Sequence, residues 1–417
     1  MSELNTNRAT VFLGAIVSFL YMLFYCYDYL LQTSFSILPH SFLIKYSITT
    51  ESFGFLSAAF FYGYTIFQIP LGYCLDRIGL KKTAIMCAAC CAIGTALFYY
   101  SGNFAMLFAA RFLIGAGTAC ACVMSVYAVS TWLLPKYFSI GVGAVQVAAC
   151  LGSIFGQAMG STLTARFGWD ATMHVVIYFA AILFVIYLFL PKHPSYNKPS
   201  AADMVRIKDL PRLLINKQII TIAILGFISW APVSVLAASW MVRLLNHNMG
   251  WSQHQAAHLL TSFWIGLAIA SLLIGKISDK MQSRRRIVLF AFVMQCLCGF
   301  FLAYTKILTP ISIVVILFLL GAAASVQTLS FILTAESVHK KVYGAAAALV
   351  NMTAAASGGV INPIFGIVVA HTGSYFAGLW LFPVLSMAGI LMTRFMLRET
   401  YSSEMNSVVT TSIETAS

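Results

Sequence analysis

A series of long apolar runs, closely spaced from residue 11 to residue 397, constrains this chain more than any other feature. A helix needs roughly 20 apolar residues to cross a bilayer, because only helices and closed barrels satisfy their backbone hydrogen bonds in hydrocarbon. The runs are continuous rather than alternating in polarity, so they predict helices and not barrel strands. We expect twelve spans, at 11–33, 53–74, 83–101, 104–127, 138–160, 172–190, 218–240, 257–276, 287–305, 311–333, 343–369 and 375–397.

The composition supports an all-α protein of the lipid bilayer. Hydrophobic residues make up 60% of the 417 residues and charged residues only 9%, whereas a soluble domain carries about 25% charged residues. The first run is too long for the core of a signal peptide, so we interpret it as the first span. Most of the ten cysteines lie inside the runs without paired spacing, which favours small buried side chains over disulfides or a metal site.

The basic residues predict the orientation in the membrane. The net charge of +13 comes from short clusters between apolar runs, which is typical of cytoplasmic loops and not of a nucleic-acid-binding surface. Most lysines and arginines lie on the side that carries both termini. We therefore expect both termini in the cytoplasm and a multi-pass protein of the inner or plasma membrane.

The spans divide into two groups of six. The longest interior break, 191–217, holds four prolines and several charges, and predicts a cytoplasmic linker between two bundles. The expected organisation is a first bundle over 1–190, the linker, a second bundle over 218–398, and a polar, disordered tail over 399–417.

One loop pattern occurs at matching positions of the two halves. After the second span the chain reads Gly72-Tyr-Cys-Leu-Asp76-Arg77-Ile-Gly79-Leu-Lys81-Lys82, and after the eighth it reads Gly275-Lys-Ile-Ser-Asp279-Lys280, continuing to Arg284-Arg285-Arg286. A repeat of half the chain is typical of transporters in which one half moves against the other. The first pattern resembles the signature of the loop between helices 2 and 3 in the major facilitator superfamily, and the second resembles its degenerate copy.

This resemblance covers nearly the whole chain and implies two six-helix bundles related by pseudo-symmetry. It also implies a gating role for the two loops. Their glycines permit close helix approach, and their charges form caps and ion pairs that fasten one gate state. A loop that only orients the chain by its positive charge remains the alternative, although such a loop needs no aspartate. The gating residues expected on this basis are Gly72, Asp76, Arg77, Gly79, Lys81, Lys82, Gly275, Asp279, Lys280 and Arg284.

Two charged residues lie inside the expected spans and away from their cytoplasmic ends, and they form the main functional candidates. Arg111 begins Arg111-Phe-Leu-Ile-Gly115-Ala-Gly117, which resembles a family motif whose arginine serves substrate binding or proton coupling. Asp28 is the only acid within the expected spans. Because a charge at membrane depth is costly and the two depths match, we expect the two residues to pair at the central cavity. Alternatives are snorkelling of Arg111 to the outer interface, a purely structural pair, and a position of Asp28 in the outer headgroups.

Polar and aromatic residues near the middle of other spans complete the candidate site. Pro232 is expected to break the seventh span and free backbone carbonyls. His254 and His258 stand four residues apart, but no further ligand completes a metal set. Singly, each remaining side chain is as compatible with helix packing as with binding. The candidates beside Asp28 and Arg111 are Tyr25, Tyr29, Gln32, Trp230, Gln327 and Asn351.

The sequence predicts a monomeric secondary transporter without cofactor. It contains no Gly-x-x-x-x-Gly-Lys-[Ser/Thr] sequence for ATP. We expect a small polar metabolite, such as an amino acid, dipeptide or organic acid, moved by alternating access with proton coupling through Asp28. The first helix is similar to the lysosomal dipeptide transporter branch, and the general pattern to bacterial nutrient permeases. Alternatives are an exporter of siderophores or drugs and, from another class, a sensor or intramembrane enzyme.

Overall fold

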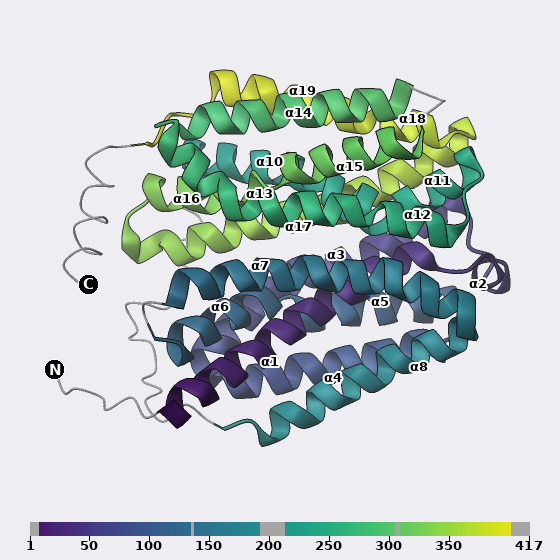
Figure 1. The fold of residues 1–417 in the computed structure, drawn as a ribbon, viewed down its shortest axis with the longest axis horizontal. Coiled ribbons are helices and arrows are strands. Elements are labelled where there is room, and N and C mark those ends of the chain that lie inside the picture. The colour runs from purple at the N-terminus through teal and green to yellow at the C-terminus, as the bar shows by residue number, and fades with distance from the viewer. Residues whose placement is uncertain (1–7, 135–136, 192–212, 305–308, 402–417) are drawn as a thin grey trace.

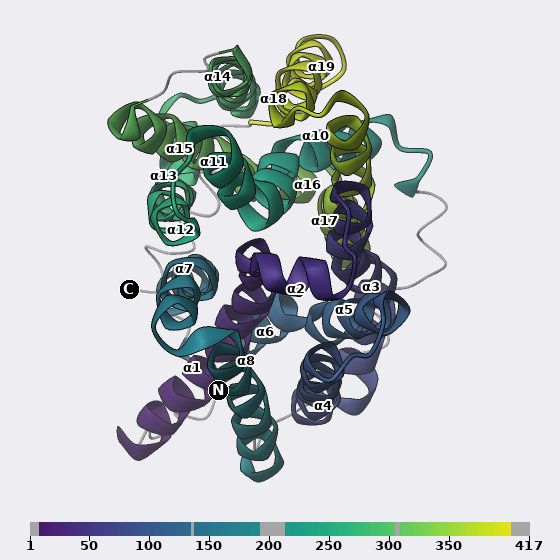
Figure 2. The same cartoon turned by 90° about the vertical axis from the view of Figure 1, so that its right-hand side faces the viewer.

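The computed structural model describes residues 8–134, 137–191, 213–304 and 309–401, and these form helices and short connections without strands. The helices lie in two groups, one above the other (Figure 1). Viewed from one end, the helices of 8–189 fill one half of the molecule and those of 217–395 the other (Figure 2). Most of the linker expected at 191–217 lies outside the described residues.

The first bundle follows the expected spans closely. Three of its six spans consist of two successive helical elements, namely α1 with η1, α5 with α6, and α7 with η3. Its elements are α1 (Arg8–Thr33), η1 (Ser34–Ile37), α2 (His40–Lys45), α3 (Thr50–Ile78), α4 (Leu80–Tyr99), α5 (Phe104–Thr118), α6 (Ala121–Trp132), α7 (Phe138–Ile154), η3 (Phe155–Met159) and α8 (Gly160–Phe189).

The second bundle repeats this order. The expected break at Pro232 is not found, because the helical stretch is continuous over Lys217–Met249. Instead, α10 ends at Ala231 and the wider π-helical segment η5 begins at Pro232, which cannot donate a helical hydrogen bond. Its elements are α10 (Lys217–Ala231), η5 (Pro232–Trp240), α11 (Met241–Met249), α12 (Gln253–Leu259), α13 (Thr261–Lys280), α14 (Arg284–Tyr304), α15 (Pro310–Ala324), α16 (Gln327–Ser337), α17 (Lys340–Thr372), α18 (Tyr375–Leu379) and α19 (Leu381–Phe395).

The twelve-span expectation is confirmed. Ten helical stretches among the described residues are long and apolar enough to cross a membrane. One of them, Ile140–Phe189, is 50 residues long and turns at Gly168, whose φ of 85° interrupts the helix, so it contains two spans. The 29-residue α3 supplies the remaining span.

Matching pairs of glycine contacts occur at equivalent helix crossings within each of the two bundles. Where α3 crosses α5, a Cβ on Gly63 would lie 2.0 Å from the carbonyl oxygen of Phe112, and one on Gly115 would lie 1.9 Å from that of Phe60. The crossing of α13 and α15 repeats this arrangement, with values of 2.2 Å at Gly266 and 2.0 Å at Gly321. Only glycine permits such backbone contact, so these positions fix the same helix crossing in each half.

The helix directions define two ends of the molecule. Helix α1 begins and α19 ends at the same end, on the left of Figure 1, which we call the terminal end. The opposite end, where α2, α11, α12 and α18 lie, is called the far end. Because α3 runs back from the far end, its residues near Gly54 are in the far half and Asp76 is at the terminal end.

Candidate functional site

A cavity lies between the two bundles at about the middle of the helices. The first bundle contributes side chains of α1, α3, α6 and α7, and the second contributes side chains of α10, α13, α16 and α17. Seven of the eight expected substrate residues line it. The lining consists of Tyr25, Asp28, Tyr29, Gln32, Phe60, Phe61, Tyr64, Cys122, Gln146, Trp230, Ser271, Gln327, Thr328, Phe331, Asn351, Ala354 and Ala355.

Asp28 is the acid of this cavity. Its residue is only 1% exposed, and its Oδ1 atom has no hydrogen-bond partner in the protein. The position follows from helix geometry, because Tyr25, Asp28, Tyr29 and Gln32 are three or four residues apart and therefore share one face of α1. A carboxylate held this way is a site for a proton or for a cationic group of a ligand.

Arg111 is the expected residue that does not line the cavity. Its guanidinium Nη1 donates to the carbonyl oxygen of Leu31 at 3.0 Å, and the group lies over the rings of Phe35 and Phe60 at 4.4 and 5.1 Å. It borders a smaller space inside the first bundle. Since Phe60 lines the central cavity, Arg111 stands behind this ring.

The expected pairing of Asp28 with Arg111 is therefore not found in this structure. Arg284, by contrast, forms ion pairs with Asp279 and Glu336. The alternative of snorkelling does not apply either, because Arg111 is 3% exposed. The aromatic rings and the free carbonyl at the end of α1 contact the guanidinium instead of a carboxylate, and its Nε has no hydrogen-bond partner.

The far end is closed by direct contacts between the bundles. The hydroxyl groups of Ser57 and Ser239 are 2.6 Å apart, and a Cβ on Gly54 would lie 2.6 Å from the carbonyl oxygen of Asn362. Across the same interface, the Arg243 guanidinium lies 3.8 Å from the ring centroid of Phe53. Such backbone and side-chain contact excludes a passage for a metabolite here.

Gln157 adds a polar cross-link to this closure. Its Nε2 donates to Ser36 Oγ at 3.0 Å and to the carbonyl oxygen of Ala237 at 2.6 Å, while its Oε1 accepts from Trp264 Nε1 at 2.8 Å. Nearby, Thr162 lies 3.1 Å from Nε2 of both His254 and His258. The two histidines thus take part in interbundle contact, and no group of metal-ligating residues is present in the described ranges.

The gating motif of the first half forms the corner between α3 and α4. Gly79 has φ 86°, a conformation that favours glycine, and it both ends α3 and starts α4. Arg77 lies over the ring of Tyr73 at 5.1 Å. Gly72 needs a correction: nothing lies within 4 Å of a Cβ placed there, so the close helix approach implied at this glycine is absent in this state.

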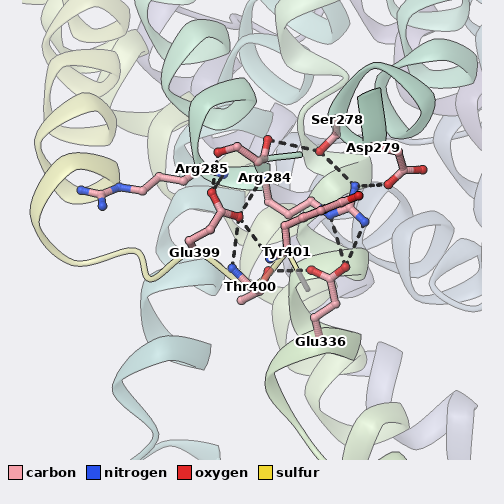
Figure 3. A network of polar contacts seen from close by, with 9 residues as sticks. Ser278, Asp279, Arg284, Arg285, Glu336, Glu399, Thr400 and Tyr401 are labelled. Atoms are coloured by element: carbon pink, nitrogen blue, oxygen red, sulfur yellow. Dashed lines mark hydrogen bonds and ion pairs between the residues drawn. The ribbon is translucent and has the colours of Figure 1, made fainter. Parts of the chain in front are cut away.

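The gating motif of the second half holds an ion-pair network (Figure 3). Arg284 bonds Asp279 at 2.5 Å and Glu336 at 3.0 Å, which joins the ends of α13 and α16 at the start of α14. The expected interhelical pairs are thus present in this half. Gln282 occupies the position that matches Gly79 and has φ 49°, so the turn is kept without glycine. Gly275, four residues before Asp279, has only an ordinary contact at 4.0 Å with Ile332.

The beginning of the expected tail belongs to this network. Glu399 accepts hydrogen bonds from the backbone N–H groups of Arg284 and Arg285, and so caps the start of α14. The Thr400 hydroxyl donates to Glu336 at 2.5 Å, and the Tyr401 ring lies 5.2 Å from the Arg284 guanidinium. The expectation of a disordered tail from residue 399 is wrong for these three residues, and 402–417 lie outside the described part.

The hydrogen bonds to Glu399 also set its acidity. Partial burial by itself raises the pKa of a carboxyl group, but the hydrogen bonds from the Ser283 hydroxyl and from backbone N–H groups outweigh this effect. The pKa of Glu399 is therefore below its usual value. The carboxylate form of Glu399 is the one that accepts these hydrogen bonds.

Several contributors were not anticipated from the sequence. Ser57, Ser239 and Glu399 carry no local signal, because serines inside spans and acids at span ends are common in packing. Glu336 could have been predicted as a member of the ion-pair network, since it is an acid at the terminal end of a span in the half that also contains Asp279 and Arg284. Phe60 and Tyr64 stand one helical turn apart on α3, which indicated a shared face.

Comparison with known proteins defines the class. The family model described as Major Facilitator Superfamily matches residues 16–244 and 222–413. The uncharacterised transporter YybO of Bacillus subtilis is 20% identical over 379 residues, covering 85% of this chain and 87% of the relative. The hexuronate transporter of Escherichia coli is 25% identical over 170 residues, covering 41% and 39%. A crystal structure of a D-xylose–proton symporter superposes with TM-score 0.76 at 16% identity, covering 94% and 98%.

The two helical bundles enclose a central cavity, and the family match makes the chain a membrane transport protein. The chain belongs to the Major Facilitator Superfamily. It is accordingly a multi-pass secondary transporter of small metabolites, as its bacterial relatives are transporters.

Proposed function

We propose that the chain moves a small polar metabolite by alternating access and that proton coupling acts through Asp28. The observation that carries this proposal is the buried carboxylate with an unbonded Oδ1 in a cavity shared by both bundles. Such a group can take up a proton or a ligand from one side and release it on the other. The polar residues proposed to bind the metabolite are Tyr25, Tyr29, Gln32, Trp230, Gln327 and Asn351.

The gating proposal concerns the two loop motifs. In the described state the far end is closed, and Gly72 at the terminal end has open space around it. We propose that the opposite state brings α3 into contact at Gly72 and opens the Ser57–Ser239 contact. Asp76, Arg77, Lys81, Lys82 and Lys280 are then gate residues rather than substrate ligands, and their substitution changes the transport rate more than the affinity.

The test is transport by the purified full chain in proteoliposomes. A metabolite mixture is supplied outside, with and without an inward proton gradient, and the lumen is analysed by mass spectrometry. Accumulation that requires the gradient, and that Asp28→Asn abolishes while counterflow exchange persists at a saturating metabolite concentration, supports the proposal. Asp170→Asn is the matched control, since Asp170 is exposed on α8. Gradient-driven accumulation that survives in Asp28→Asn contradicts coupling through this residue.

A further inference from the structure

The charge of the cavity restricts what it can bind. Its lining contains one carboxylate, Asp28, and no lysine, arginine or histidine. The buried cation Arg111 does not line the cavity: its guanidinium lies over the Phe60 ring and donates to the carbonyl oxygen of Leu31. While Asp28 is ionised, an anion placed in the cavity meets a buried carboxylate and no opposite charge, which is unfavourable in a low dielectric.

Polar atoms of the cavity wall that lack hydrogen-bond partners indicate which polar groups the ligand carries. Oδ1 of Asp28 is a buried acceptor without a partner, and Nε2 of Gln327 is a buried donor without one. The Gln327 amide is oriented by its other end, because its Oε1 accepts from the hydroxyl groups of Ser229 and Ser330 at 3.2 and 3.3 Å. Ser271 Oγ also lacks a partner. Buried polar atoms are normally satisfied, and unlike the other unpartnered atoms these three belong to residues that line the cavity, where a ligand can supply the missing partners.

The acceptor and the donor come from opposite bundles. Asp28 is on α1, whereas Gln327 is on α16 and Ser271 on α13. A ligand that satisfies both ends needs a donor at one end and an acceptor at the other. Around Asp28, the rings of Tyr25, Tyr29, Tyr64 and Trp230 line the cavity, and aromatic faces attract a positive group.

We infer that the substrate carries a primary or secondary ammonium that donates to Asp28, and a carbonyl, carboxyl or hydroxyl oxygen that accepts from Gln327. An N–H donor is needed because the free atom of Asp28 is an acceptor, which a quaternary ammonium cannot satisfy. Amino acids, dipeptides and amino alcohols fit this description, and organic acids without an amine do not. This inference rests on the proposed function, which it narrows.

The experiment removes the ammonium group from a whole metabolite pool. A small-metabolite extract from a bacterial culture is divided, and one part is treated with an amine-selective acetylating reagent, which converts amines to neutral amides. The thermal unfolding midpoint of the purified full chain is measured with the acetylated extract and with a mock-treated one. Asp28→Asn and the control Asp170→Asn are measured in parallel, and Asp28→Glu tests whether a carboxylate alone restores the response.

We expect the mock-treated extract to raise the midpoint of the wild-type chain and of Asp170→Asn, and the acetylated extract to have no effect. In Asp28→Asn the concentration of extract needed for the same shift should rise about 100-fold, the effect of stranding a buried charge, and Asp28→Glu should recover part of it. An equal shift with the acetylated extract overturns the inference that the substrate carries an ammonium group. It leaves the proposal of a metabolite transporter in place. No shift with either extract contradicts the proposed function itself.

Discussion

At Arg111, aromatic rings and a backbone carbonyl take the place of an acidic partner. The guanidinium lies against Phe35 and Phe60 and binds the carbonyl oxygen of Leu31. This arrangement stabilises the point where α1 ends and the η1 segment begins. Arg111 is thus a positioning residue for α1, which carries Asp28 one turn earlier.

A double-mutant cycle distinguishes this role from an ion pair. Asp28→Asn and Arg111→Gln should each lower the unfolding midpoint or the transport rate. In the described state, their separate effects on the free energy of unfolding should add within about 0.5 kcal/mol. Breaking a buried ion pair instead strands a charge at a cost of about 3–5 kcal/mol and gives strong coupling. Coupling of that size would show that Asp28 and Arg111 form an ion pair after all.

Single residues show what the sequence can and cannot provide. Tyr25, Asp28, Tyr29 and Gln32 were predictable because helical periodicity places them on one face. The partner of Arg111 was not, since matching depth along two helices does not fix the rotation of either one. The Ser57–Ser239 contact was also beyond prediction, because it depends on the conformational state of two bundles and not on local pattern.

At the scale of elements, the sequence repeat corresponds to the same glycine contacts in both halves of the chain. The resemblance of Phe112-Leu-Ile-Gly115 to Phe318-Leu-Leu-Gly321 corresponds to the same helix crossing in each half. We expect Gly115→Ala and Gly321→Ala to lower stability by similar amounts, about 1–3 kcal/mol, since each added methyl meets a carbonyl oxygen. Thermal unfolding in detergent measures this. Gly102→Ala, where nothing lies within 4 Å, is the control, and equal loss there would contradict the packing account.

The segment Glu399–Tyr401 fastens three helix ends at the terminal end. Because the pKa of Glu399 is lowered in the folded chain, its carboxylate contributes stability above the ordinary glutamate value of 4.5 and loses this contribution as the pH falls through the lower folded value. The difference in unfolding midpoint between wild type and Glu399→Gln should therefore be largest near neutral pH and disappear in acid. A difference independent of pH would assign Glu399 a role other than charge.

At the scale of the whole molecule, the basic residues predict which end faces the cytoplasm. A cysteine at Met281, exposed at the terminal end, should react with an impermeant maleimide only after the cells are opened. A cysteine at His247, exposed at the far end, should react in intact cells. The unmodified chain measures the background of its ten cysteines. The reverse pattern would invert the proposed orientation and the direction of both gates.

The central claim is that the far end must open once in every transport cycle. Its most direct test replaces Ser57 and Ser239, whose hydroxyl oxygens are 2.6 Å apart across the two bundles, with a pair of cysteines. Transport is measured in proteoliposomes before oxidation, after oxidation and after reduction, with each single variant as control. The account predicts that oxidation stops transport in the double variant alone and that reduction restores it. Transport at the full rate by a chain that is completely cross-linked at this pair would contradict it.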